Sequence, residues 1–340
     1  FIPAILLSVL PLRFRYSLEA RPYSQGEFFS ALSTLAFIWL MERQSVKSAL
    51  VYALCLIVGI YSQPFACFTT AAHFVWVLLM ARHQRRLIYL TLGSIALMGI
   101  SFAPWYLYAS RQWQQAIHEG GHLFDFSWKI PLMLIREISG AGYLGGGILL
   151  ILIFIAMKKG SIASPLRALL MICALIPVVC VLFVDAVFSY FFAIRQLVFI
   201  LPPIILLAAD GLNTLMNSGF RRVAFATAFI FLIFCIADIR WLTKPRENWE
   251  LAAKTIRRMQ DHHSACALYV PSAFVGYYSF FDPQLNQTVC DEQSIQNHSV
   301  VLVVSPYTLE KDRILGEQLV NGKQIAETQT SGMSTIHVYR

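Results

Sequence analysis

Charged side chains are scarce in this chain of 340 residues: Asp, Glu, Lys and Arg make up 14% of it, whereas 57% is hydrophobic. Soluble globular domains carry about a quarter charged residues. The shortage of charge and the 25 phenylalanines therefore exclude an ordinary soluble protein and indicate a membrane protein. The net charge of +8 comes from short basic segments between apolar runs, without an aromatic and basic patch of the RNA-binding type. We therefore predict no nucleic-acid partner.

Other signatures are missing as well. No Gly-rich phosphate loop opens a predicted helix, which leaves nucleotide binding unsupported. The seven cysteines include no CxxC pair and no zinc-ribbon spacing. The chain has no signal-peptide pattern and starts inside an apolar run, residues 1–12, that is too short to span a bilayer. We interpret this run as the second half of a helix and expect the sequence to be a fragment of a longer protein.

Apolar runs that read as membrane helices dominate the first two thirds of the chain. They are residues 28–41, 49–61, 66–80, 87–108, 143–157, 168–184, 188–209 and 223–239. Pro64 predicts a tight turn at Gln63 between two of them. The sequence thus predicts an α-helical polytopic membrane protein, with about eight full transmembrane helices plus a half helix over residues 1–243.

Lys and Arg gather in alternate loops between these runs. The richer set is Arg43 and Lys47; Arg82, Arg85 and Arg86; Lys158, Lys159 and Arg167; and Arg221 and Arg222. Loops rich in Lys and Arg stay in the cytoplasm. This pattern predicts a multi-pass protein of the inner or plasma membrane, with residues 16–23, the polar segment 110–142 and the C-terminal tail on the external side.

The tail, residues 244–340, has the pattern of a small α/β domain. Its predicted helices are residues 249–259, 272–281 and 309–319, and its predicted strands are residues 268–271, 300–304 and 335–339. Cys266 and Cys290 lie in this tail, and an external domain permits them to form a disulfide. The sequence supports equally well the alternative that both cysteines are reduced thiols in the core.

Residues 16–23, with the sequence Tyr-Ser-Leu-Glu-Ala-Arg-Pro-Tyr, form a short polar stretch between two apolar runs. Glu19 and Arg21 are costly at a bilayer edge unless they bind something, so we predict a polar pocket there. Arg195 lies inside the run 188–209, and its guanidinium suits a phosphate group, although it can also snorkel to the membrane surface.

The carboxylates at two helix ends, Asp185 and Asp210, are expected to be structural. His118-Glu-Gly-Gly-His122 matches H-E-x-x-H, which on a helix presents two zinc ligands and a general base, Glu119. The paired glycines oppose a helix by about 2 kcal/mol. A membrane-bound zinc metalloprotease is therefore an alternative. The other readings are a polar external loop and a metal or sugar contact in a transferase pocket.

The stretch 16–23 resembles the S-x-E-A-R-P-Y segment of GT-C class bacterial membrane glycosyltransferases, relatives of protein O-mannosyltransferases and of the aminoarabinose transferase that modifies lipid A. Residues 59–65 are similar to the family's G-L-Y-T-H-Y-F turn, with Gln-Pro in place of His-Tyr. Residues 103–105 are similar to its Pro-Trp at a span end. Residues 195–211 and 249–256 resemble its basic leucine-proline helix and its W-x-x-A-A-x-x-I segment.

The resemblance implies transfer of a sugar from a polyprenyl-phosphate-linked donor to a lipid, glycan or protein acceptor on the external face of the membrane. It implies that Glu19, Arg21, Tyr23 and Arg195 bind the substrate and the lipid phosphate. A divalent metal ion remains open as a cofactor. The family's acidic catalytic residue lies in the first external loop, so the catalytic residue is expected upstream of this chain. A non-catalytic scaffold or transporter is the last alternative, although no repeat of paired broken helices indicates a transporter.

Overall fold

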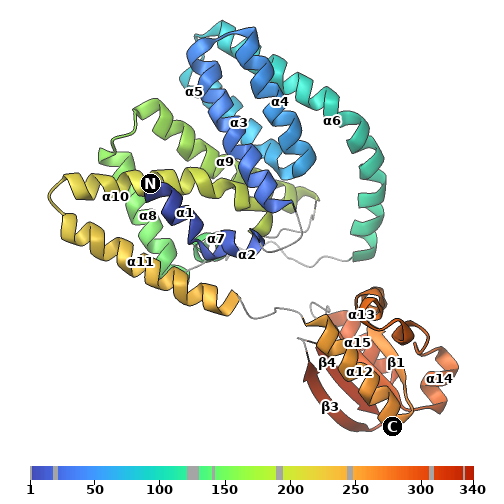
Figure 1. Cartoon of the computed structure of the whole chain (residues 1–340). Coiled ribbons are helices and arrows are strands. Elements are labelled where there is room, and N and C mark those ends of the chain that lie inside the picture. The colour runs from blue at the N-terminus through green and yellow to red at the C-terminus, as the bar shows by residue number, and fades with distance from the viewer. Residues whose placement is uncertain are drawn as a thin grey trace. The chain divides into compact units, whose positions relative to one another are not determined.

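The computed structural model describes residues 2–17, 22–120, 130–139, 142–188, 194–242, 248–305, 310–331 and 334–340. The chain divides into two compact units, Phe1–Trp241 and Leu242–Arg340. The first unit is helical, and the second combines helices with a four-stranded sheet (Figure 1).

Within the described residues, each predicted apolar run after residues 1–12 lies in helical segments of the first unit. The long helices are α3 (Tyr23–Arg43), α4 (Val46–Ser62), α5 (Cys67–Met80), α6 (Arg85–Gly120), α8 (Gly142–Lys159), α9 (Ser164–Phe188), α10 (Leu201–Asn217) and α11 (Arg221–Leu242).

Among the described residues, five segments are long and apolar enough to cross a membrane. They are Arg85–Ser110, Gly142–Lys159, Ser164–Val184, Ile194–Asn217 and Arg221–Ile239. These segments indicate a multi-pass membrane protein. Helices α4 and α5 are apolar but shorter, and α3 begins with polar turns, so membrane crossing by these three helices stays a prediction.

Three segments differ from the sequence prediction. The apolar start, predicted as half of one helix, forms two short helices, α1 (Ile2–Ser8) and α2 (Pro11–Ser17), because Pro11 lacks the amide that would continue α1. Helix α6 extends to Gly120, and α7 (Ile130–Ser139) occupies part of the predicted polar segment. The run 188–209 contains a 3-10 helix, η2 (Ile194–Ile200), and α10 follows it with prolines in its first turn, where missing amides are tolerated.

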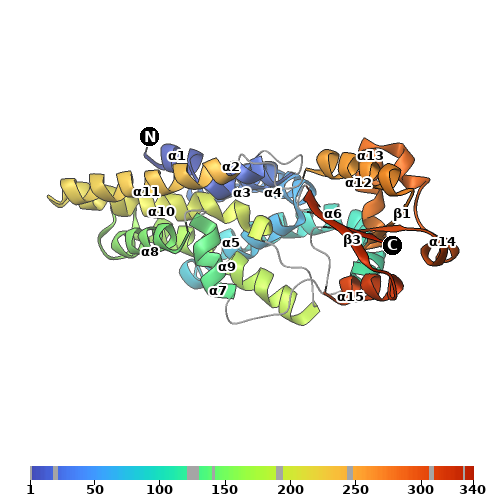
Figure 2. The ribbon, with the colours of Figure 1, turned by 90° about the horizontal axis from the view of Figure 1, so that it is seen from below.

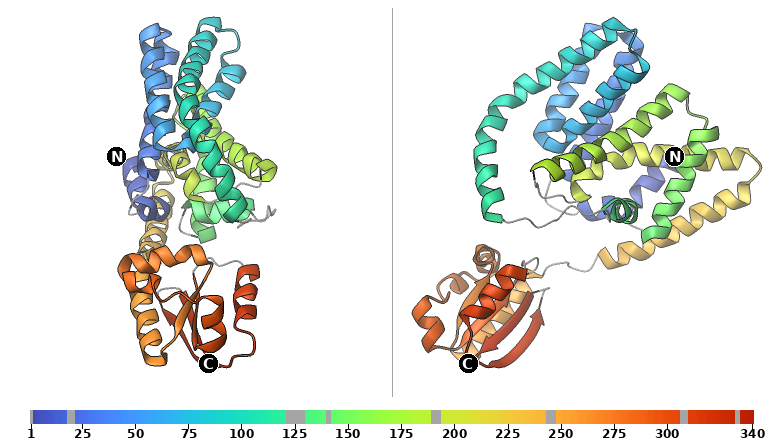
Figure 3. Two further views of the ribbon diagram at one scale, coloured as in Figure 1. Left: turned by 90° about the vertical axis from the view of Figure 1, so that its right-hand side faces the viewer. Right: turned by 180° about the vertical axis from the view of Figure 1, so that it is seen from behind.

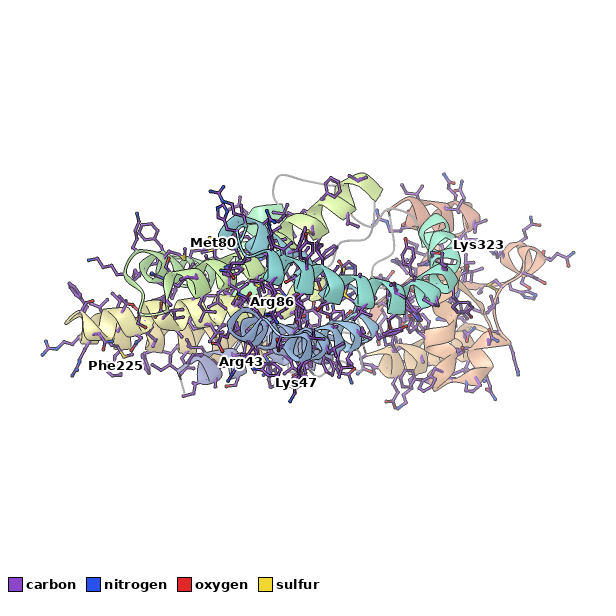
Figure 4. The ribbon with its side chains drawn as sticks, turned by 90° about the horizontal axis from the view of Figure 1, so that it is seen from above. Arg43, Lys47, Met80, Arg86, Phe225 and Lys323 are labelled. Atoms are coloured by element: carbon purple, nitrogen blue, oxygen red, sulfur yellow. A yellow bond between two sulfur atoms is a disulfide. The ribbon has the colours of Figure 1, made fainter. Side chains whose placement is uncertain are left out.

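The turns rich in Lys and Arg lie away from α2 and α7. In Figure 1 the α3–α4 and α5–α6 turns are at the top of the first unit and the α8–α9 and α10–α11 turns are at its left. Gln44 Nε2 donates a hydrogen bond of 2.9 Å to Gln84 Oε1, which joins the first two turns. Figure 4 shows Arg43, Lys47 and Arg86 at this end. The orientation of these turns toward the cytoplasm stays a prediction.

Helix α10 packs closely on α8 and on the turn that follows it. A Cβ added at Gly211 would lie 2.0 Å from the Leu152 carbonyl oxygen, so only glycine permits this approach of the two backbones. The neighbouring Asp210 is 5% exposed and accepts hydrogen bonds from the amide and hydroxyl of Ser161 at 2.9 and 2.6 Å. Asp210 thus ties the α8–α9 turn to α10, the structural role expected for it.

Gly211→Ala is expected to destabilise the first unit by about 2 kcal/mol, because the added methyl group meets a backbone that cannot move aside. Gly93→Ala is the matched control, since a Cβ at this helical glycine meets nothing within 4 Å. Alanine should be neutral or stabilising there. Thermal unfolding of both variants in detergent, followed by circular dichroism, compares them, and equal midpoints would contradict the close contact.

The second unit has a mixed sheet with the strand order β1-β2-β4-β3. Its strands are β1 (Cys266–Val270), β2 (Val300–Val304), β3 (Ile325–Ser331) and β4 (Ser334–Tyr339), with β1 and β2 parallel and the other pairs antiparallel. Helices α12 (Trp249–His263) and α13 (Val275–Phe281) cover one face, and α15 (Glu310–Leu319) covers the other (Figure 2 and Figure 3). The remaining short helices are η1 (Pro64–Ala66) in the first unit and η3 (Ser272–Phe274), η4 (Pro283–Asn286) and α14 (Glu292–Asn297) in the second.

Alternating side chains of β2 explain the two layers of helices. Val301 and Val303 pack toward α12 with Ile256, whereas Val300 and Leu302 belong to the cluster on the opposite face. The predicted helices and strands of the tail are confirmed, apart from boundary shifts of a few residues. The edge strand β3 is missing from the prediction because most of its side chains are exposed and polar.

A disulfide joins Cys266 at the start of β1 to Cys290, with a Cα–Cα distance of 5.0 Å. Of the two alternatives that the sequence leaves open, a disulfide or two reduced thiols, the structure has the disulfide.

The double substitution Cys266→Ser and Cys290→Ser is expected to lower the free energy of unfolding of the second unit by about 3 kcal/mol, because it opens a covalent loop in the unfolded chain. Hydrogen exchange across residues 248–305 measures this loss. Dithiothreitol should produce the same loss of stability in the wild type and leave the double variant unchanged. A further loss of stability in the double variant would show that dithiothreitol acts other than by reducing this disulfide.

Candidate functional site

The end of α2 and the start of α3 bring charged and aromatic side chains together. Arg13 donates from Nε to both carboxylate oxygens of Glu27 at 3.0 and 3.2 Å. The Glu27 side chain is 5% exposed and that of Arg13 is 38% exposed, so the guanidinium compensates a buried carboxylate. Beside this pair, the rings of Tyr16 and Tyr23 meet edge to face at 5.4 Å, and the Arg15 guanidinium lies 5.4 Å from the Tyr16 centroid.

The turn between α4 and η1 packs against the same part of α3. Gln63 adopts an extended backbone, with φ −150° and ψ 113°, because Pro64 follows it, which confirms the predicted turn. A Cβ added at Gly26 would lie 2.1 Å from Gln63 Oε1, so α3 accepts this side chain only at a glycine. Gln63 Oε1 and Ser30 Oγ are both buried without a hydrogen-bond partner among the described residues. Burial without a partner costs free energy, so these two atoms mark a place where the contacts of the described residues leave hydrogen-bonding capacity unused.

The 3-10 helix η2 closes this cluster from a distant part of the sequence. It contacts α2, α3 and η1, the elements that carry Arg13, Glu27 and the turn at Gln63. Arg195 is half-buried at the second position of η2, and Gln196 beside it is 7% exposed. We name Arg13, Tyr16, Tyr23, Glu27, Gln63 and Arg195 the polar cluster.

Further charges lie around the end of α2. Half-buried Asp238 of α11 interacts electrostatically with Glu137 of α7 and with Arg15. Glu137 in turn forms an ion pair with Arg136. The α2 end of the first unit therefore combines several guanidinium groups with carboxylates that partly neutralise them, whereas Lys and Arg predominate in the turns at the other end.

The predicted site residues are only partly described. Tyr23 and Arg195 lie on α3 and η2, which contact each other. Glu19 and Arg21 lie outside the described residues, between Ser17 and Pro22. Asp185 falls in the last turns of α9. The sequence analysis did not assign Arg13 or Glu27 to the site, because the two residues are 14 positions apart and no local pattern links them.

No protein-family model, curated protein or solved structure matches this chain. The resemblance to GT-C class transferases therefore rests on the quoted motifs and stays a prediction. Of the residues in those motifs, Tyr23 begins α3 and Arg195 lies on η2, and these two elements contact each other.

The H-E-x-x-H motif lies at the C-terminal end of α6. The helix ends at Gly120, so His118 and Glu119 occupy its last turn, and His122 lies outside the described residues. Among the residues that the structure describes, no group of three or more His, Cys, Asp or Glu side chains is arranged to hold a metal ion. Zinc binding by this motif stays a prediction.

The polar cluster can bind an anion at the edge of a helical membrane unit. Guanidinium groups form paired hydrogen bonds with phosphate oxygens and keep their charge at any physiological pH. Half-buried Tyr23 combines an apolar ring with a hydroxyl, which suits the boundary between lipid and water, and buried Tyr16 packs against its ring. The side chains therefore match an amphipathic ligand with an anionic head.

Proposed function

We propose that this chain belongs to a glycosyltransferase that takes a sugar from a polyprenyl-phosphate-linked donor and passes it to a lipid, glycan or protein acceptor on the external face of the membrane. The observation that carries the proposal is that η2, the element of Arg195, contacts α3, the element that begins at Tyr23, and also α2. These elements are far apart in the sequence.

In this proposal the polar cluster holds the donor by its phosphate. Arg195 and Arg21 supply the cations, whereas Arg13 and Glu27 form a neutral pair that fixes α2 against α3. In the proposal Gln63 Oε1 accepts a hydrogen bond from a polar group of the ligand, and the Ser30 hydroxyl donates or accepts one; neither atom has a partner among the described residues.

The external location of the second unit is part of the proposal. The disulfide between Cys266 and Cys290 supports it, because such bonds persist in oxidising compartments outside the cytoplasm. The basic turns support it from the other side, since Lys and Arg favour the cytoplasmic face and those turns lie away from α2 and α7.

A transfer assay in membranes tests the function. Membranes that contain the full-length protein are incubated with polyprenyl-phosphate donors carrying radiolabelled sugars, and label in lipid, glycan and protein fractions is counted. We expect label to move from the donor to one of these fractions, and membranes without the protein to show no transfer. Retention of every labelled sugar on its donor in both preparations would refute the proposed function.

A further inference from the structure

Helix α13 of the second unit presents a group of aromatic side chains to solvent. Tyr277 is 54% exposed, Phe280 81% and Phe281 47%, and they follow one another at i, i+3 and i+4, so they share one face of the helix. We name these three residues the aromatic face. An exposed aromatic surface of this kind on a small domain marks a binding site.

The opposite side of α13 fixes this orientation. Tyr278 is fully buried, and its hydroxyl lies 2.9 Å from the hydroxyls of both Ser305 and Ser334. Trp249 stacks on Tyr277 with ring centroids 5.0 Å apart, which supports the aromatic face from α12. The packing of Tyr278 and Trp249 therefore fixes α13 with the exposed rings directed to solvent.

The connection to the first unit limits how far this group can lie from a membrane. Helix α11 contains a segment long and apolar enough to cross a bilayer and ends at Leu242. Only residues 243–248 separate Leu242 from Trp249, the first residue of α12. Seven residue steps span at most about 25 Å even when fully extended. Trp249, and Tyr277 stacked on it, are thereby tethered close to the end of a membrane helix.

The composition of the segment indicates which kind of surface it meets. Residues 271–289 contain no Lys or Arg and one carboxylate, Asp282, so this segment supplies no electrostatic attraction to anionic lipid. Aromatic rings instead favour the headgroup region of a bilayer through their apolar area. We propose that the aromatic face of α13 inserts into the lipid interface and holds the second unit against the membrane.

Photocrosslinking in vesicles tests this insertion. The whole chain carrying benzoylphenylalanine in place of Phe280 is reconstituted in phosphatidylcholine vesicles, irradiated and analysed by mass spectrometry. The matched control carries the same group in place of Leu315, which is 58% exposed on α15, the helix that covers the other face of the sheet. We expect lipid adducts at position 280 and none at position 315.

A second variant tests whether the aromatic face acts as one unit. Benzoylphenylalanine at position 277 should form lipid adducts in the wild-type background and lose them when Phe280→Ser and Phe281→Ser are added. These serines replace exposed rings and leave buried Tyr278 in place, so the domain remains folded. Adducts at 315 as abundant as at 280, a covalent dimer of the chain, or no adduct at 280 would each overturn the inference.

Discussion

Arg195→Ala is expected to weaken binding of a polyprenyl-phosphate-linked sugar by about 10- to 100-fold, because a charge-assisted hydrogen bond to phosphate contributes about 1.5–3 kcal/mol. Arg195→Lys keeps the charge but loses the planar fork, so we expect a smaller loss of affinity. Equilibrium binding of a fluorescent donor to the purified protein in detergent measures both variants.

Arg43→Ala is the control for Arg195→Ala. Arg43 lies at the α3–α4 turn, at the far end of the helix that begins beside η2, so its loss should leave donor affinity unchanged. Equal weakening by both alanine substitutions would show a general effect of positive charge on lipid binding. Unchanged affinity of Arg195→Ala would remove Arg195 from the binding site.

Arg13→Ala is expected to destabilise the first unit by about 2–3 kcal/mol, because it leaves the buried carboxylate of Glu27 without its partner. This loss is smaller than for a fully buried ion pair, because the Arg13 side chain is 38% exposed and water screens the pair from that side. Adding Glu27→Gln should recover most of the loss, since a neutral amide tolerates burial better than an unpaired charge. Thermal unfolding in detergent measures the single and double variants.

Arg136→Ala is the matched control for Arg13→Ala. Its ion pair with Glu137 has side chains that are 45% and 31% exposed, and such surface pairs contribute about 0–1 kcal/mol. The comparison separates burial of the carboxylate from the mere presence of an ion pair. If Arg13→Ala and Arg136→Ala shifted the unfolding midpoint equally, burial of Glu27 would not be the cause.

Apolar runs and turn residues predict the helices of this chain, because the spacing of apolar residues and the backbone effect of proline can both be recognised in a short stretch of sequence. The extension of α6 to Gly120 and the presence of α7 escaped prediction, since both segments mix polar and apolar residues. The strand β3 escaped as well, because it gains its hydrogen bonds from β4 and buries few of its side chains.

Only those residues of the polar cluster that stand out in the local sequence were predicted. Tyr23 and Arg195 stand out in the sequence as polar or charged residues beside apolar runs. Glu27 looks like one more polar residue at a helix start, and only the fold shows that α2 brings Arg13 onto it. The role of Gln63 depends on the missing side chain of Gly26 on another helix, which no local pattern reveals.

Donor binding by the purified wild-type protein tests the central proposal most directly. We expect saturable binding of a polyprenyl-phosphate-linked sugar at one equivalent per chain, competed by polyprenyl phosphate and not by the uncharged polyprenol, because the polar cluster recognises the phosphate. The zinc content of the same preparation is measured alongside. Absence of saturable binding together with one equivalent of zinc would contradict the transferase proposal and favour the motif from His118 to His122.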